Sequence, residues 1–561
     1  ERSRGLGDVY KRQTSRAVHA RRGAAAVQQP VPVAMAGDKA PDASSGQSTD
    51  TSPSIKNLAR LLSMLQSGAE DAPPAPHEHK FWKTQPVKQP GDKSELPMGA
   101  IEPNKPPENV RSEPYALPSD FEFVTVNMDR DEELKEVYDL LTHHYVEDGE
   151  ATMRFKYTPD FLRWVLHHPN YNKAWHVGVR VKSSQKLVAF IAGIPQELRV
   201  RDTAFHVTEI NFLCVHKRLR TKRMAPVLIK EITRRCNQSG IFQAIYTAGQ
   251  VLPTPISCAR YYHRTLRARK LVEIGFSSVP RGMTMEEHEA RFALPSTTSV
   301  PGLREMQASD VPAVGRLLRR YMARFDMAPR FSDAEVRHMF VRAAPTTPAA
   351  QPVIWAYVVE APNGSITDFF SFYNLPSSVL GNEKHDTLAA AYLFYYASDA
   401  AFDNEATPST SDEASPYDIA RREKPAWQCS DQSHLTAREA ADEAHVQPWY
   451  TESLDCKKRL KARLCALMDD MLILARDQGF DVVNCLTGMD NALFTQELKF
   501  GPGDGFLRFY LFNWRVAPIA GGMGTRKDEE GLDPAAVDES AAVARPLPPT
   551  TYGSGNGIVM V

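Results

Sequence analysis

The chain has 561 residues, a formal net charge of −1 at pH 7 and 42% hydrophobic residues, so it can build sizeable cores over several domains. The near-neutral charge argues against a dedicated nucleic-acid-binding protein, which is usually basic overall. The seven cysteines form neither a C-x-x-C pair nor a zinc-type pattern, and their density fits a reducing compartment. No apolar run reaches the roughly 18 residues of a membrane span, and no secretory signal is visible, so we expect a cytoplasmic protein.

The N-terminal segment is expected to carry little structure. Residues 1–53 are rich in Ala, Ser, Gln and Arg, which is typical of disorder. Residues 55–65 have helical apolar spacing and predict a short amphipathic helix, after which a Pro-rich linker runs over 72–76. We therefore assign 1–76 to a disordered segment with one short helix. Because the chain begins at Glu1 and not at methionine, we also expect it to be part of a longer sequence.

Three strands and a basic loop follow. Residues 174–181 and 187–194 predict a hairpin, because both are rich in β-formers and a polar turn separates them. A third strand, 205–215, leads into a basic loop and then an amphipathic helix. A helix N-terminus offers unpaired N–H groups that favour phosphate, so the pattern indicates a pyrophosphate site. A solvated basic loop fits the same spacing equally well. The loop carries Lys217, Arg218, Arg220, Lys222 and Arg223.

The second half of the chain repeats this order of elements. Residues 309–318 predict a helix with Asp310 as its N-cap. Residues 353–359 and 366–372 predict paired strands around Asn363-Gly364, a strong hairpin-turn signal. Helix, hairpin, strand and helix thus occur in both halves, but no repeat is visible in the letters. Duplication is therefore a structural hypothesis.

Two segments interrupt the pattern. Residues 397–448 are acidic and lack periodicity, and we predict a surface insertion there. Residues 516–555 are rich in Gly, Asp, Ala and Pro, and we predict mostly loop. The last residues, 557–561, turn apolar again. A polar chain seldom ends on four apolar residues unless they are buried or bound.

The run from Glu209 to Pro226 closely resembles the signature of N-myristoyltransferases (glycylpeptide N-tetradecanoyltransferases), which move a fatty acyl chain from CoA to an N-terminal glycine. Further motifs of the family follow in its order, at 81–87, 145–148, 246–249, 260–264 and 499–505. The resemblance spans about 79–396 and 458–561. It implies an α/β fold of two related, GNAT-like halves about a saddle-shaped twisted sheet. We place an acyl-CoA-binding half at 77–285 and a peptide-binding half at 286–561.

The resemblance also implies a mechanism without an acyl-enzyme, in which the glycine amine attacks the thioester directly. The backbone N–H groups of Phe212 and Leu213 would form the oxyanion hole, a role that suits preorganised donors. They could equally be ordinary strand residues, unless a bulge frees their amides. Thr247 would contact the substrate amine and Asn211 would lie nearby, although each could be a satisfied strand residue.

By the same resemblance, the C-terminal carboxylate of Val561 would be the general base. A free α-carboxyl has a pKa of about 3.3–3.7, so it is a poor base in water. Burial among the apolar residues 558–560 would raise that pKa. The tail could instead pack as a terminal strand, or serve as a C-terminal ligand for a PDZ-type groove.

The two substrates would bind to residues carried over by the resemblance. Acyl-CoA is expected as the donor substrate, with no metal and no permanently bound cofactor. Its matching positions are His79, Lys80, Phe81, Trp82, Phe212, Leu213, Cys214, Val215, Arg220, Thr221, Lys222, Arg223, Met224 and Ala225. The peptide groove would be lined by Tyr145, Val146, Met153, Phe155, Tyr157, Tyr261, His263, Ser377, Tyr392, Gly503 and Asp504.

Details of peptide preference are less well indicated. An acidic side chain at Asp504 suits a basic substrate. Gly149 and Met153 stand where acidic and aromatic residues are common in the family. The expected partners are proteins with an N-terminal glycine. We also expect a monomeric enzyme, and association with the ribosome is plausible. Alternatives are a related N-acyltransferase with another acyl or acceptor preference, an inactive relative that binds acyl groups or peptides, and a nucleic-acid adaptor acting through 217–223.

Overall fold

The computed structural model describes residues 79–90, 92, 98–146, 152–342, 352–402, 435, 437–443, 446–522 and 553–561. One compact unit contains everything from Phe81 to Val561, and a separate unit spans Gln13–Lys80. The fold below concerns the first of these. The segment predicted to be disordered, 1–53, and the short helix predicted at 55–65 lie outside the described residues.

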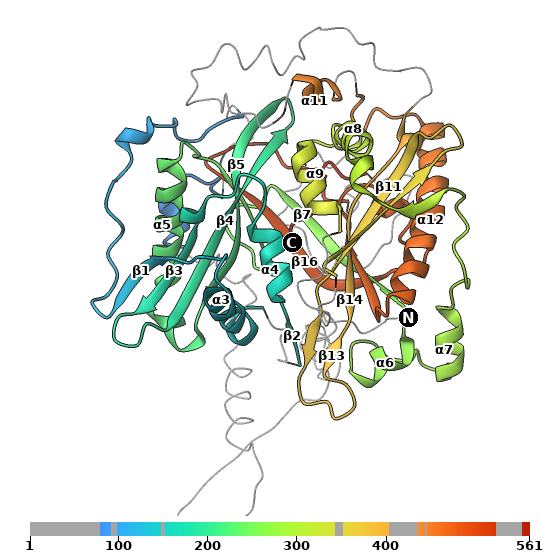
Figure 1. Ribbon diagram of the computed structural model, residues 1–561, viewed down its shortest axis with the longest axis horizontal. Helices are drawn as coiled ribbons and strands as arrows, with labels where there is room; N and C mark the ends of the chain where they lie inside the picture. The colour runs from blue at the N-terminus through green and yellow to red at the C-terminus, as the bar shows by residue number, and fades with distance from the viewer. Residues whose placement is uncertain are drawn as a thin grey trace, which may run out of the picture. The chain divides into compact units, whose positions relative to one another are not determined.

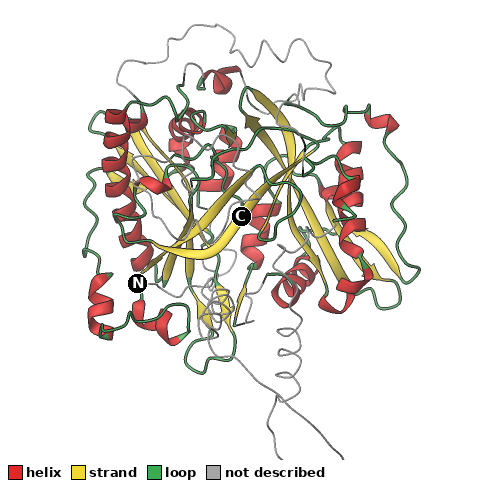
Figure 2. Ribbon diagram, turned by 180° about the vertical axis from the view of Figure 1, so that it is seen from behind, coloured by secondary structure: helices red, strands yellow, loops and turns green. Residues whose placement is uncertain are grey.

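A large mixed sheet runs through the unit, and its strands cross the middle of both views (Figures 1 and 2). Its order is β1-β3-β4-β5-β6-β16-β7-β15-β14-β11-β10-β8, with β9 paired to β4. These strands are β1 (Phe121–Thr125), β3 (His176–Val181), β4 (Leu187–Val200), β5 (Thr203–Val215), β6 (Ala244–Ala248), β7 (Ser257–Thr265), β8 (Leu303–Glu305), β9 (Met327–Pro329), β10 (Ile354–Glu360), β11 (Ile366–Asn374), β14 (Ala390–Ser398), β15 (Val482–Leu486) and β16 (Gly501–Phe512). A small second sheet joins β13 (Thr387–Leu388), β12 (Ser377–Val379) and β2 (Met153–Phe155).

Helices cover the sheet. The α-helices are α3 (Asp131–His144), α4 (Pro159–Leu166), α5 (Met224–Gln238), α6 (Ala268–Glu273), α7 (Met285–Arg291), α8 (Val311–Met322), α9 (Asp333–Phe340), α11 (Ala437–Ala441) and α12 (Leu454–Asp477). Short 3-10 turns are η1 (Trp82–Thr84), η2 (Pro107–Asn109), η3 (Lys173–Trp175), η4 (Lys217–Lys222), η5 (Ala308–Asp310), η6 (Asp399–Ala401) and η7 (Asn491–Leu493). No helix among the described residues is long and apolar enough to cross a bilayer.

The two halves of the sheet have the same topology. Read inward from its two edges, β1-β3-β4-β5-β6 in the first half corresponds to β8-β10-β11-β14-β15 in the second half. In the first half β5 leads through α5 into β6, which runs parallel to β5. In the second half β14 leads through α12 into β15, which runs parallel to β14. Strands β16 and β7 pair with each other between the halves. The predicted α/β fold is therefore confirmed, and the strand order supports the predicted relation between the halves.

The first half follows the predicted elements closely. The hairpin predicted at 174–181 and 187–194 is β3 and β4, and the third predicted strand is β5. Alternate residues of β4 enter different cores, as the pleat of a strand requires. Phe190 belongs to the core that contains α3 and α4 residues, and the next residue, Ile191, to the core that contains α5 residues. Both faces are thus covered, which fits the long apolar stretches of β4.

The second half confirms the predicted hairpin and corrects one detail. Gly364 has φ +81° in the turn between β10 and β11, and Asn363 accepts hydrogen bonds from Ser365. Asp310 precedes α8 as predicted, but its side chain does not cap that helix. Its carboxylate instead accepts from the Gln307 N–H at 2.8 Å and pairs with Arg304 at 2.7 Å. The carboxylate of Asp310 thus closes the 3-10 turn η5, which directly precedes α8.

The ends of the predicted surface insertion belong to the core. Ala397 and Ser398 are fully buried at the end of β14. On the far side, Glu443 is buried and pairs with the buried Arg330 at 2.8 Å. Residues 403–434, the middle of the predicted insertion, lie outside the described residues.

Asp470 generates a testable prediction about stability. It is fully buried on α12 and accepts hydrogen bonds from the Ser299 and Val300 N–H groups at 2.8 Å. Asp470→Asn would turn one acceptor into a donor that faces these N–H groups, so it should lower the free energy of unfolding by about 1–3 kcal/mol. Chemical denaturation measures this, with the neighbouring, less buried Asp469→Asn as the control. Equal stability of the two variants would contradict the assignment.

Candidate active site

A β-bulge in β5 lies at the predicted oxyanion hole. The pairing of β4 with β5 matches Phe190 to Cys214 and Ala192 to Asn211. Two residues of β5, Phe212 and Leu213, therefore stand opposite the single residue between Phe190 and Ala192, which defines a bulge. Phe212 is fully buried with φ +56°, a conformation that costs a bulky residue about 1–3 kcal/mol. The rest of the fold imposes this backbone geometry.

The sheet opens on the other side of the same segment. Strands β5 and β6 pair in parallel only at Thr208–Ala244 and Glu209–Ile245. Both strands then continue, β5 to Val215 and β6 to Ala248, without pairing further with each other. The backbone of the bulge thus faces a gap in the ladder. Peptide groups in such a gap can bind a ligand, because no neighbouring strand uses their donors and acceptors.

Asn211 joins the bulge to the C-terminus. Its Oδ1 accepts from the Phe212 N–H at 2.9 Å, and its Nδ2 donates to the backbone oxygen of Val561 at 2.5 Å. Thr247 lies half-buried on β6, two residues beyond the last position at which β6 pairs with β5. Phe212, Asn211 and Val561 are therefore linked by hydrogen bonds at one place, and the C-terminus lies centrally between the two groups of strands in Figure 1.

A buried carboxylate, missed from the sequence, lies in the same cluster. Glu209 accepts hydrogen bonds from Asn211 Nδ2 at 3.3 Å and from Gln196 Nε2. Burial raises its pKa to about 7, although the two hydrogen bonds act in the opposite direction. The only sign of this residue in the sequence was a charged side chain within a stretch otherwise rich in β-forming residues.

The C-terminal tail packs between two cores. Ile558 and Met560 are buried in a cluster with residues of β4, β5, β6, β7 and β16. Val559 and Val561 pack against the main core on the other side. The alternation is that of an extended segment, and it confirms that the apolar end is buried.

The basic loop forms the 3-10 turn η4 before α5. Its cationic residues and Thr221 are exposed, whereas Met224 is buried at the start of α5. Arg223 has φ +56° and no side chain caps the first turn of α5, so the helix N–H groups point toward the same exposed surface. Arg220 donates to the carbonyl oxygen of His144, which ties the loop to the end of α3. Behind the loop, Cys214 and Val215 are buried, and Ala225 is half-buried.

The aromatic entry motif reaches β6. Trp82 stacks on Tyr246 with ring centroids 5.3 Å apart, and Phe81 packs edge-on against Trp82 at 5.1 Å. Tyr246 directly precedes Thr247, so these rings lie next to the proposed amine contact. His79 and Lys80 belong to the separate unit Gln13–Lys80, and no contact between them and the site is assigned.

Aromatic residues predicted for the peptide groove form a continuous chain to the bulge. Tyr157 contacts Phe212 at 5.4 Å, Phe155 at 6.0 Å and Tyr145 at 5.6 Å between ring centroids. Phe155 contacts Tyr392 at 6.4 Å. The β2–β12 pairing places Ser377 opposite Phe155 and Val379 opposite Met153. Val146 is exposed at the edge of this group.

His263 and the glycine-rich strand β16 form the other side of the groove. The Nδ1 atom of His263 lies 2.6 Å from Oδ1 of Asn484, so the amide oxygen fixes the ring with the proton on Nδ1. A Cβ atom on Gly503 would lie 2.4 Å from Nε2 of His263, so this close approach requires glycine. Tyr261 is adjacent, and burial raises its pKa to about 12. The side chain of Asp504 is not described, and Asn484 was not predicted from the sequence.

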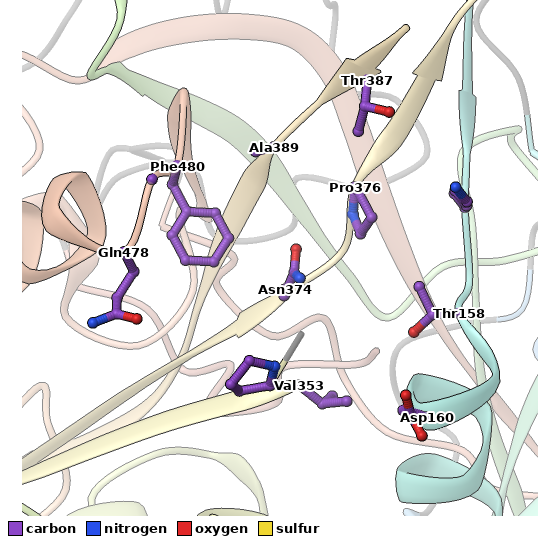
Figure 3. Close-up of a pocket in the computed structure, with 12 residues that line it drawn as sticks. Thr158, Asp160, Val353, Asn374, Pro376, Thr387, Ala389, Gln478 and Phe480 are labelled. Carbon is purple, nitrogen blue, oxygen red and sulfur yellow. The ribbon is translucent and has the colours of Figure 1, made fainter. Parts of the chain in front are cut away.

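A separate pocket of about 440 Å³ borders the strands that carry the groove (Figure 3). It is lined by Lys156, Thr158, Asp160, Asn374, Gln478 and Phe480, among others. None of the predicted site residues lines it, so it is distinct from the active-site cluster. Within the described part of the chain, no group of three or more His, Cys, Asp or Glu residues could hold a metal ion.

Comparison with known proteins identifies the family of this chain. The family model for the N-terminal domain of myristoyl-CoA:protein N-myristoyltransferase matches residues 100–259, and the model for its C-terminal domain matches 273–537. The chain belongs to the N-myristoyltransferase family. The boundary that we predicted between its halves, at 285/286, stays a prediction.

Individual relatives support the same family assignment. The glycylpeptide N-tetradecanoyltransferase of Mycosarcoma maydis is 52% identical over 90% of this chain and 79% of that protein. Its counterpart from Saccharomyces cerevisiae is 44% identical over 83% of this chain and 94% of that protein. A crystal structure of the Saccharomyces cerevisiae N-myristoyltransferase with bound myristoyl-CoA aligns with a TM-score of 0.70 and 42% identity, covering 86% of this chain and 100% of that chain.

Glu209 predicts a pH dependence of stability. Its pKa is raised from 4.5 to about 7 in the folded protein, so its contribution to stability is fully present below pH ~4.5 and lost as the pH rises through about 7. Relative to Glu209→Gln, the parent should lose about 2–3 kcal/mol between pH 5 and pH 8.

Denaturant unfolding at the two pH values measures this loss. The exposed Glu132→Gln on α3 is the control, and it should follow the parent. Parallel pH profiles for the parent and Glu209→Gln would show that the carboxyl stays ionised in the fold.

Proposed function

We propose that this chain transfers the myristoyl group of myristoyl-CoA to the N-terminal glycine amine of proteins. The observation that carries the proposal is the meeting of the β5 bulge with the C-terminal Val561 through the side chain of Asn211. The matched family models and the names of the relatives support the same reaction. The donor substrate is myristoyl-CoA, which the yeast relative binds in its crystal structure.

The cationic turn would hold the CoA phosphates. Arg220, Lys222 and Arg223 offer charge, and the uncapped first turn of α5 offers N–H groups. The thioester would then lie along the segment Phe212 to Val215, in the gap between β5 and β6. Trp82 would cover the bound donor from its stack on Tyr246.

The oxyanion hole needs one local change. The Phe212 N–H donates to Asn211 Oδ1 in the ligand-free structure, so the carbonyl oxygen of the thioester would replace that acceptor. The N–H groups of Phe212 and Leu213 would then stabilise the charge that develops on this oxygen. Removal of one such donor typically costs about 3 kcal/mol of transition-state stabilisation.

The amine nitrogen would attack the thioester carbon while Thr247 and Val561 orient it. A glycine α-amine has a pKa of about 7.7–8.0, so most of it is protonated at neutral pH. The Val561 carboxylate would take the proton, the C–S bond would break, and CoA would leave as its thiolate and gain a proton from the site or from solvent. Ile558 and Met560, which precede this carboxylate in the tail, are buried.

The acceptor peptide would lie along the aromatic chain from Tyr145 to Tyr392 and past His263. We keep Asp504 as the proposed contact for a basic residue of the substrate. Cytoplasmic location, a monomeric state and action near the ribosome are further proposals, and they follow from the family resemblance.

The direct test is CoA release from myristoyl-CoA with a glycine-starting peptide and with the same peptide starting with alanine. We expect release with glycine only, because an alanine methyl group next to the amine would crowd the approach to the thioester. Release with both peptides would favour a related N-acyltransferase of broader acceptor choice. Tight acyl-CoA binding without release would identify an inactive relative and contradict the proposal.

Extension of the chain by one alanine after Val561 tests the proposed base. The new peptide bond would replace the carboxylate that Asn211 contacts, and positioned proton transfer contributes about 10²–10⁴-fold to rate. Turnover should therefore fall by about 10²-fold or more, while the Kd for myristoyl-CoA stays within about twofold. Normal turnover of the extended chain would exclude Val561 as the base.

A further inference from the structure

The second half of the molecule contains a counterpart of the catalytic bulge. Strands β14 and β15 pair in parallel at Ala390–Val482, Ala391–Val483 and Tyr392–Asn484, and then part, as β5 and β6 do. Against β11, the pairing matches Leu393 to Phe372 and Tyr396 to Phe370. Phe394 and Tyr395 therefore stand opposite one residue, as Phe212 and Leu213 do in the first half.

The second bulge holds the chain's own tail. The Tyr395 hydroxyl accepts a hydrogen bond from the Val559 N–H at 3.0 Å and donates one to the Val559 carbonyl oxygen at 3.2 Å. Its ring is buried against Phe394 at 4.6 Å and Phe331 at 4.9 Å between centroids. Burial raises the pKa of Tyr395, so the hydroxyl keeps its proton and serves as donor and acceptor at once.

The hydrogen bonds of the tail divide it into a firmly anchored first part and a short terminal part. In the anchored part, the Met489 N–H donates to the Asn556 carbonyl oxygen and the Gly557 N–H donates to the Met327 carbonyl oxygen, both at 2.8 Å. Beyond Ile558, the hydrogen bonds found among the described residues are the two between Tyr395 and Val559 and the one between Asn211 and Val561. The end is therefore held at two points, one in each half of the molecule.

Loss of the Val559 contact would leave the end of the tail held by the Asn211 hydrogen bond and by side-chain packing alone. An extended chain advances by about 3.3 Å per residue, so even a small change in the path of residues 559–561 would shift the carboxylate by about an ångström. A misplacement of about 1 Å at a reacting group can cost about 10²-fold in rate. We propose that Tyr395 is a positioning residue that holds Val561 in register for the proposed acyl transfer. This inference rests on the proposed role of the Val561 carboxylate.

Tyr395→Phe removes only the hydroxyl and tests the proposal in two ways. The first readout needs no catalysis: carboxypeptidase A should release the C-terminal valine about tenfold faster from this variant, because the tail end keeps only one of its two hydrogen-bonded contacts. The matched control is Tyr396→Phe. Its hydroxyl also accepts from an N–H group, of Asp490 at 3.0 Å, and donates to Asn491 at 2.8 Å, but it does not touch the tail.

The second readout is kcat with the glycine-starting peptide, in the full chain and in a chain that ends at Met560. In the full chain Tyr395→Phe should lower kcat by about 10- to 100-fold, with an unchanged Kd for myristoyl-CoA. In the shortened chain the same substitution should change kcat by less than about twofold, because no carboxylate remains at position 561 to be positioned.

Three results would overturn the inference. These are an unchanged valine release, an unchanged kcat in the full chain, or an equal loss of kcat in both chains, which would show a purely structural role. A parent chain that releases no CoA would overturn the proposed function instead, while valine release would still decide whether Tyr395 holds the tail.

Discussion

The bulge at Phe212 and Leu213 is the constraint on which the rest of the site depends. A regular strand would direct both amides into the ladder with β4 or β6, and neither could meet a ligand. The bulge places two residues opposite one, and the ladder with β6 ends at Glu209. This geometry requires a positive φ at a buried phenylalanine, which is unfavourable in isolation. The cores on both sides of β5, packed by α3, α4 and α5, supply the energy that keeps it there.

The two related halves use the same local geometry for different purposes. In the first half, the pairing of β5 with β6 ends before the bulge, so the bulge amides lie outside that ladder. In the second half, the bulge at Phe394 and Tyr395 carries a buried hydroxyl that holds Val559 of the same chain. The tail then crosses to the first half, where Asn211 contacts Val561. An acyl-donor site in one half and a proton acceptor delivered from the other would thus meet at the strands that join them.

Much of this arrangement was predictable from local patterns. The β-rich runs of β3, β4 and β5, the Asn363-Gly364 turn and the basic run before α5 all depend on neighbouring residues, and the structure confirms them. The apolar end of the chain correctly indicated burial. The family motifs added the roles of Phe212, Leu213 and Val561, which stay proposals.

Features that depend on distant residues were not predictable. The register shift that makes each bulge follows from pairing with another strand. Glu209 reads as an isolated charge until Gln196 and Asn211 are placed beside it. Asp310 resembles a helix cap, but Arg304 and the Gln307 N–H take its carboxylate first. Tyr395 is one of several aromatic residues in its strand, and only the path of the tail distinguishes it.

The most direct test of the central claim is a crystal structure with a non-hydrolysable myristoyl-CoA analogue. The account predicts that the carbonyl oxygen next to sulfur lies about 2.7–3.1 Å from the N–H nitrogens of both Phe212 and Leu213. It also predicts that Asn211 Oδ1 has left the Phe212 N–H and that the Val561 carboxylate faces the carbonyl carbon. A carbonyl oxygen that lies away from the bulge, with the Phe212–Asn211 hydrogen bond intact, would contradict it.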